Sequence, residues 1–118
     1  MSLTVKEIVA PVTTRPVTYR TVNTDSLTVD ATAGGVRIDT NKINDKTVRA
    51  EISLETAQIR FQTLLGLAVT AGGTEGSPLI EVGDVRVLLG HEKIINARFI
   101  RTGGTSGLLQ VLLEEEDL

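Results

Sequence analysis

Three short stretches of the sequence hold residue types that could bind a ligand or take part in catalysis. The most suggestive is ARFIRTGGTSGLLQ, at residues 97–110, where glycines and hydroxyls follow an arginine as they would in a phosphate site. A P-loop requires the pattern GxxxxGK[ST] followed by a helix whose N-terminus faces the phosphate. Here the lysine is missing and a second strand-like run follows the glycines. The stretch is therefore predicted to be a structural turn and not a phosphate-binding loop.

The predicted structural turn joins two strands of a β-hairpin and consists of Gly103, Gly104, Thr105 and Ser106. Adjacent glycines supply the positive φ angles that a tight hairpin needs. Threonine and serine hydroxyls can bond to the turn backbone. Replacing both glycines with valine is therefore expected to impair folding or assembly.

The other two stretches surround His91 and the sequence DTNKIND. His91 is the only histidine, and no nucleophile elbow accompanies it, so it is predicted to be a surface turn residue. DTNKIND offers Asp39, Asn41 and Asp45 for calcium, but Lys42 intrudes and the spacing is not that of an EF-hand. No catalytic, cofactor-binding or metal-ligating residue is predicted, and the protein is not expected to be an enzyme.

The composition argues against several classes of protein. The formal net charge is −3 and the pI about 5.1, whereas a nucleic-acid binder needs a basic face. The absence of cysteine excludes disulfides and thiolate metal sites. No apolar run approaches the roughly 20 residues of a membrane span, and the first residues lack the features of a signal peptide. A soluble chain with no nucleic-acid or membrane partner is expected.

Short alternating apolar runs, separated by many of the 11 glycines, dominate residues 26–118. In TVRAEISLET, for example, Val48, Ala50, Ile52 and Leu54 share one face, which is the period of a strand. We expect about eight strands and almost no helix; a helix over residues 54–68 is the alternative to strand and loop. The predicted fold is all-β, an antiparallel β-sandwich or jelly-roll-like barrel.

Individual runs of this region lead to more specific expectations. Strands are predicted in VRIDT, in PLIEVGDVRVLLG on both sides of a Gly-Asp turn, and in KIINARFIRT. GLLQVLLE is apolar on both faces, so it is either a central strand or covered by a neighbouring subunit. AEISLETAQIRF and ARFIRTGGTSGLLQV resemble each other and are interpreted as two equivalent hairpins.

Residues 1–25 differ from the rest and are predicted to form an extended N-terminal arm. Pro11 and Pro16 exclude a helix there, because the residue before a proline is driven toward extended conformations. An isolated extended segment needs a strand to pair with, in its own subunit or in another. Because arginine is over-represented at interfaces, the candidate subunit-contact residues include several arginines. These residues are Arg15, Val17 and Tyr19 in the arm, and Arg60, Arg98 and Arg101 in the body.

Three segments together, ISLETAQIRFQT, EVGD and NARFIRTGGTSGLLQVLL, resemble small virion structural proteins of tailed bacteriophages and prophages. The resemblance covers roughly residues 46–113, and LLGLAVTAGG departs from the shorter turn expected after IRF. It implies a non-enzymatic capsid decoration (cement) protein that is made in the host cytoplasm and incorporated into the virion. Its partners would be itself, as a homotrimer or other homo-oligomer, and the major capsid protein or other virion proteins. The alternatives are a minor tail or head–tail component, or a receptor- or glycan-binding β-sandwich module.

Overall fold

The computed structural model describes residues 16–73 and 76–117. Within them the chain is mostly antiparallel β structure with one short α-helix, so the predicted all-β class is confirmed. No helix in these ranges is long and apolar enough to cross a membrane. In chain order the elements are β1 (Tyr19–Val29), the 3₁₀ helix η1 (Thr40–Lys42), β2 (Arg49–Thr56), β3 (Ile59–Gln62), β4 (Leu79–Ile80), β5 (Val85–Leu89), α2 (His91–Asn96), β6 (Arg98–Arg101) and β7 (Gly107–Glu116).

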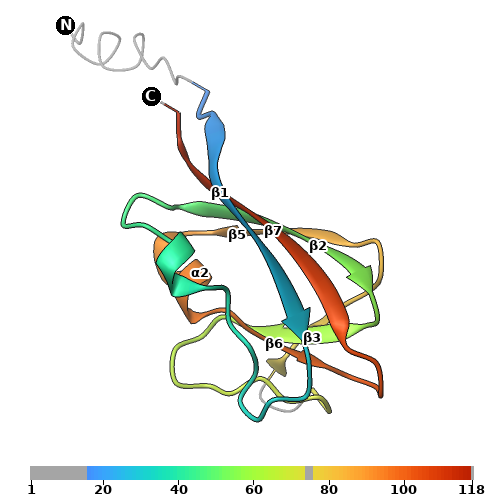
Figure 1. Cartoon of the computed structure of the whole chain (residues 1–118). Coiled ribbons are helices and arrows are strands. Elements are labelled where there is room, and N and C mark those ends of the chain that lie inside the picture. Colours follow the sequence, from blue (N-terminus) through green and yellow to red (C-terminus); the bar gives the residue numbers. More distant parts are fainter. Residues whose placement is uncertain (1–15, 74–75, 118) are drawn as a thin grey trace, which may run out of the picture.

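The strands form two antiparallel sheets (Figure 1). The larger sheet has the order β1-β7-β2-β5, and the smaller sheet has the order β4-β3-β6. The last strand, β7, therefore lies between β1 and β2. The predicted central position of β7 is confirmed, and on its outer face Leu112 is 39% exposed.

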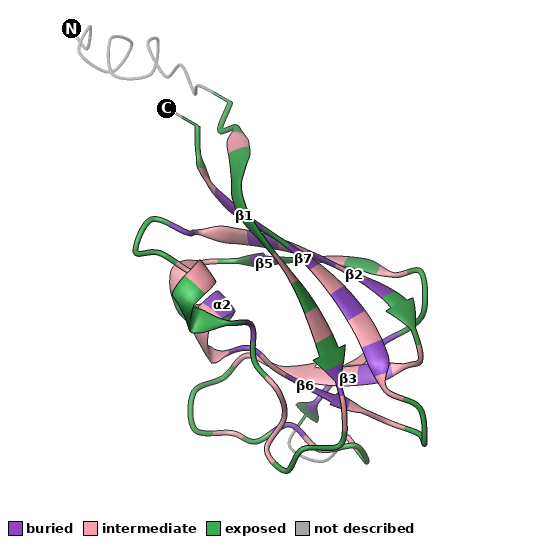
Figure 2. Ribbon diagram, viewed as in Figure 1, coloured by how far each residue is buried: buried purple, intermediate pink, exposed green. Residues whose placement is uncertain are grey.

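Buried side chains from both sheets form one hydrophobic cluster. The larger sheet contributes Ile52 and Leu54 of β2, on the face that the alternation predicts, together with every second residue of β7. Figure 2 shows this alternation along β7, where buried segments are separated by partly exposed ones. The smaller sheet contributes Ile59 and Phe99, and the Phe99 ring stacks on Phe61 with a centroid separation of 6.4 Å.

Of the four connections that carry the chain between the sheets, two form neighbouring corners. The chain passes from β2 to β3 through residues 57–58, and from β6 to β7 through residues 102–106. They lie side by side, because the backbone N–H and the hydroxyl of Thr102 both donate to the Gln58 carbonyl, at 3.3 and 3.2 Å. The two similar segments are therefore neighbouring corners, at which strands switch sheets, and not two hairpins.

The predicted hairpin at Gly103 and Gly104 is wrong. β6 pairs with β3, whereas β7 pairs with β1 and β2, so the two flanking strands lie in different sheets. Neither glycine has a positive φ angle. A five-residue connection between two sheets is wider than a two-residue hairpin turn, so it does not require left-handed backbone. In this connection the Ser106 hydroxyl accepts a hydrogen bond from Arg101.

The strand predicted over KIINARFIRT is also partly wrong, because its first residues belong to α2 and only Arg98–Arg101 form a strand. Ile94 and Ala97 are both buried, three residues apart, which is a helical spacing. The Arg37 guanidinium donates to the Ile95 carbonyl at 2.9 Å and so satisfies a group near the end of this short helix. In VRIDT, Val36 forms only an isolated bridge with Phe99.

The region after β3 is the predicted loop, and the alternative helix over residues 54–68 is not formed. At the N-terminus, β1 runs through the predicted boundary between residues 25 and 26. Residues 19–25 pair with β7 of the same chain. The remainder of the predicted arm up to Arg15 lies outside the described residues.

Candidate interaction surface

His91 is the first residue of α2 and is half-buried, so it is not the surface turn residue that the sequence predicts. Its Nδ1 atom lies 2.9 Å from the Thr47 carbonyl, which accepts a hydrogen bond when that nitrogen carries the proton. The ring thereby fastens the start of the helix to the segment before β2. Within residues 16–73 and 76–117 there is no group of three or more acidic, histidine or cysteine side chains that could hold a metal ion.

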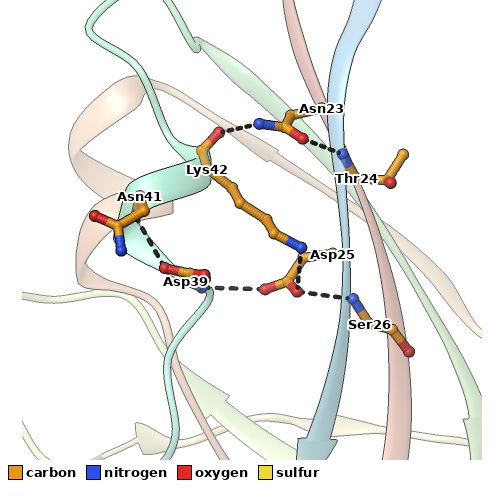
Figure 3. Close-up of polar contacts among 7 residues, drawn as sticks. All are labelled: Asn23, Thr24, Asp25, Ser26, Asp39, Asn41 and Lys42. Atoms are coloured by element: carbon orange, nitrogen blue, oxygen red, sulfur yellow. Dashed lines mark hydrogen bonds and ion pairs between the residues drawn. The ribbon is translucent and has the colours of Figure 1, made fainter.

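Two of the three candidate calcium residues, Asp39 and Asn41, belong to a polar network that attaches η1 to β1 (Figure 3). The Asp39 side chain accepts from the Asn41 backbone N–H at 3.0 Å and caps η1. The Asp39 backbone N–H in turn donates to Asp25 of β1 at 3.1 Å. The Lys42 Nζ atom lies 3.3 Å from Oδ1 of the same Asp25 carboxylate. The positive charge beside Asp25 is therefore supplied by the Lys42 side chain.

Asp25 is the centre of this network. Burial by itself would raise the pKa of its carboxyl group. The hydrogen bonds from the Asp39 backbone, from Lys42 and from the Ser26 backbone act in the opposite direction, and together they hold the pKa below the ordinary value of 3.8. The network is consequently a structural clamp that depends on an ionised Asp25.

Three of the six predicted subunit-contact residues, Tyr19, Arg60 and Arg101, contact other residues of their own chain. The Arg49 guanidinium lies over the Tyr19 ring, with its Cζ atom 5.3 Å from the centroid of that ring. Arg60 donates to the carbonyls of Ala71 and Ser77, at 3.0 and 2.8 Å, and so holds the loop between β3 and β4.

The other predicted contact residues differ in their surroundings. Arg101 bonds to Ser106, and the Arg98 side chain is half-buried in β6. Val17 is exposed, whereas Arg15 lies outside the described residues. Arg60, Arg98 and Arg101 therefore lie on the paired strands β3 and β6 of the smaller sheet, whereas Tyr19 is the first residue of β1 in the larger sheet.

A different set of residues forms the clearest apolar surface feature. Val85, Val87 and Leu89 of β5 are 54%, 47% and 56% exposed, and they alternate along one side of the strand. β5 ends the sheet order and is therefore an edge strand within the described residues. We call these three residues the β5 ridge. Exposed hydrophobic residues on an edge strand mark a place where another strand can pair.

A groove follows the same edge, and its lining includes Val87 and Leu89 of the ridge. It has a volume of about 300 Å³ and lies between β5 and the end of β3, where Phe61, Thr63, Leu88 and Lys93 line it. A second hollow of about 340 Å³ shares Thr63 and Lys93 with it. The exposed side chains of Leu64 and Leu65 border this hollow. The open edge of the larger sheet therefore has further apolar side chains beside the β5 ridge.

The sequence alone did not reveal this surface. The pattern in DVRVLLG predicts a strand but does not say which of its faces is buried; Val85 and Val87 are exposed, whereas Leu88 is buried. The signal was ambiguous because positions 87, 88 and 89 are all apolar. Pairing with β2 decides the orientation, since it places Leu88 opposite buried Ala50.

Comparison with protein families, curated proteins and solved structures gives no match to this chain.

Proposed function

We propose that the protein is a non-enzymatic virion structural protein of a tailed phage or prophage, and specifically a capsid decoration (cement) protein. In this proposal the described body is a β-sandwich, and the N-terminal residues form an arm that contacts neighbouring subunits. The partners are further copies of the chain and the major capsid protein. The protein is made in the host cytoplasm and becomes part of the virion.

The observation that carries this proposal is the β5 ridge at the open edge of the larger sheet. Three exposed apolar side chains beside unpaired strand backbone are unfavourable in water and are suited to a protein partner. A particle surface that needs reinforcement offers such a partner. The resemblance of residues 46–113 to tailed-phage virion proteins supplies the kind of particle. The exposed connection at Gly103, Gly104 and Thr105 has no aromatic side chain, which favours assembly over glycan recognition.

The test uses purified full-length protein and separated heads and tails from the phage or prophage whose gene cluster encodes it. Co-sedimentation with heads, together with a higher disassembly temperature of the loaded heads, is the expected result. Sedimentation with tails would instead support a minor tail component. Binding to neither, together with binding to host-surface glycans, would support the receptor-binding alternative and contradict the proposal.

A further inference from the structure

We propose that two copies of this chain pair edge to edge through β5, in an antiparallel register centred on Val87. Such a contact joins the two four-stranded sheets into one continuous sheet. It also places the β5 ridges of the two copies side by side. The inference rests on the proposed function only in assigning this surface to assembly; the pairing itself follows from the geometry of β5.

The backbone of β5 has the hydrogen-bonding groups for a second partner. At its ends, the Gly90 N–H donates to the Val48 carbonyl at 2.7 Å, and the Leu54 N–H donates to the Asp84 carbonyl at 3.1 Å. Backbone groups of an antiparallel strand point alternately to its two sides. The backbone N–H and C=O groups of the even-numbered residues of β5 point toward β2. Those of residues 85, 87 and 89 therefore point toward the free edge.

The side chains select a second copy of β5 as the occupant. When Val87 pairs with Val87 of the other copy, Val85 pairs with Leu89, so the exposed face has only apolar cross-strand pairs. On the opposite face Arg86 then lies across from Leu88. A register centred on Arg86 would oppose two like charges, and one centred on Leu88 would leave Val85 beyond the end of the partner strand. The strand is therefore self-complementary in charge and shape in one register.

Arg86 bears on this contact because an inward-pointing charge on an edge strand commonly prevents pairing. Here the guanidinium donates to the Leu79 carbonyl at 3.2 Å and to the Asp84 carboxylate at 3.3 Å, both in its own chain. Its charge is thus neutralised within the subunit. The groove beside Leu88 leaves space for the partner's side chains on this face.

A cysteine scan tests the register directly, because the natural chain contains no cysteine. In the proposed pair the Cα atoms of the two Val87 residues are about 5.5 Å apart, within the range that a disulfide spans. The two Val85 residues are about 14 Å apart along the strands and cannot be linked. Under mild oxidation V87C should form disulfide dimers at least about tenfold faster than V82C, an equally exposed control in the preceding turn.

V85C alone and L89C alone should stay monomeric on a non-reducing gel, whereas a mixture of the two variants should cross-link. Light scattering supplies the second measurement: V87K should weaken dimerisation of the full chain at least tenfold, and V22K, on the opposite edge strand, should not. Equal cross-linking of V82C and V87C, or an unchanged V87K dimer, would overturn the inference.

Two further outcomes separate the inference from the proposed function. A chain that stays monomeric at every concentration, yet binds heads through Val87, would refute self-pairing and leave the decoration role intact. A chain that dimerises through Val87 but binds neither heads nor tails would support the pairing and refute the virion role.

Discussion

Gly107 lies directly against Ile59, at the point where β7 begins beside the corner between β2 and β3. A β-carbon on Gly107 would be 2.7 Å from Cγ2 of Ile59 and 3.0 Å from the Thr56 carbonyl oxygen. Ile59 is fully buried in the hydrophobic cluster and has little space to move. The close approach of the two corners therefore requires glycine at position 107, and not at 103 or 104, where a β-carbon would meet nothing within 4 Å.

The first prediction compares these glycines. Gly107→Ala should lower the free energy of unfolding by about 1–3 kcal/mol, because it overpacks a closed part of the core. Gly103→Ala and Gly104→Ala should each change it by less than about 0.5 kcal/mol, as exposed substitutions usually do. The double change of Gly103 and Gly104 to valine should then also fold, contrary to the expectation from the sequence. Urea unfolding midpoints measure all four variants, and a larger loss at 103 or 104 than at 107 would contradict this account of the corner.

The second prediction concerns the pH dependence of the clamp between η1 and β1. The pKa of Asp25 in the folded protein is below 3.8, so its ionised form stabilises the fold at neutral pH. That contribution is complete above the unfolded pKa and is lost as the pH falls from 3.8 through the lower folded pKa. Asp25→Asn should therefore reduce the melting temperature at pH 7, and the difference from wild type should shrink in acid below pH 3.8.

Lys42→Met is the matched variant for this clamp, because it removes the ammonium group and leaves the backbone hydrogen bonds to Asp25 in place. It should raise the pKa of Asp25, as measured by NMR titration of the side-chain carboxyl carbon. A melting-temperature difference between wild type and Asp25→Asn that is the same at pH 7 and in acid would show that the ionised carboxylate is not what stabilises this contact.

The third prediction concerns the ion pair on the outer side of the larger sheet. The side chain of Arg49 donates to Glu114, which is only 8% exposed, and it also lies 3.7 Å from Glu51. Arg49→Met leaves the Glu114 carboxylate without this partner and should cost about 2 kcal/mol of folding free energy. The double variant Arg49→Met/Glu114→Met should recover most of the loss, since it removes both charges.

Tyr19→Leu tests a smaller part of the same cluster, because it removes the aromatic ring under the Arg49 guanidinium. It should lower the folding free energy by about 0.5–1 kcal/mol. Chemical denaturation of the four proteins, wild type included, completes the comparison. If the double variant were no more stable than Arg49→Met, the loss would have to be attributed to packing of the arginine stem and not to the unpaired charge.

The sequence predicts local structure here better than it predicts strand partners. Alternation in β2 correctly places Ile52 and Leu54 in the core, because period two depends only on the strand itself. The segments around residues 57–58 and 102–106 each read as strand, turn and strand. That pattern is common to a hairpin and to a corner between sheets, and contacts distant in sequence decide between them.

The same limit explains the two other differences. The exposure of Val85 and Val87 follows from the pairing of β5 with β2, which no local pattern contains. α2 has only six residues, of which Ile94 alone is buried, so it gives too little periodicity to distinguish a helix from a strand. The candidate interaction surface depends on both the edge position and the orientation of β5, and so it appears only once the sheet is assembled.

The last prediction concerns Gly34 and Gly35, which lie in the turn after β1 and have φ angles of 82° and 93°. A β-carbon at Gly34 would meet nothing within 4 Å, whereas one at Gly35 would press against the Val69 side chain and lie 3.0 Å from Cβ of Arg98. Gly34→Ala should therefore cost only the left-handed backbone strain, about 1–2 kcal/mol.

Gly35→Ala should cost that strain and, in addition, the displacement of the buried Val69 side chain that lies beside Gly35. Combining it with Val69→Ala should therefore cost less than the sum of the two single changes, by a coupling of about 0.5–3 kcal/mol. A double-mutant cycle by urea denaturation measures this coupling, and Gly34→Ala with Val69→Ala is the control pair that should be additive. Additivity in both pairs would mean that Val69 does not pack against Gly35.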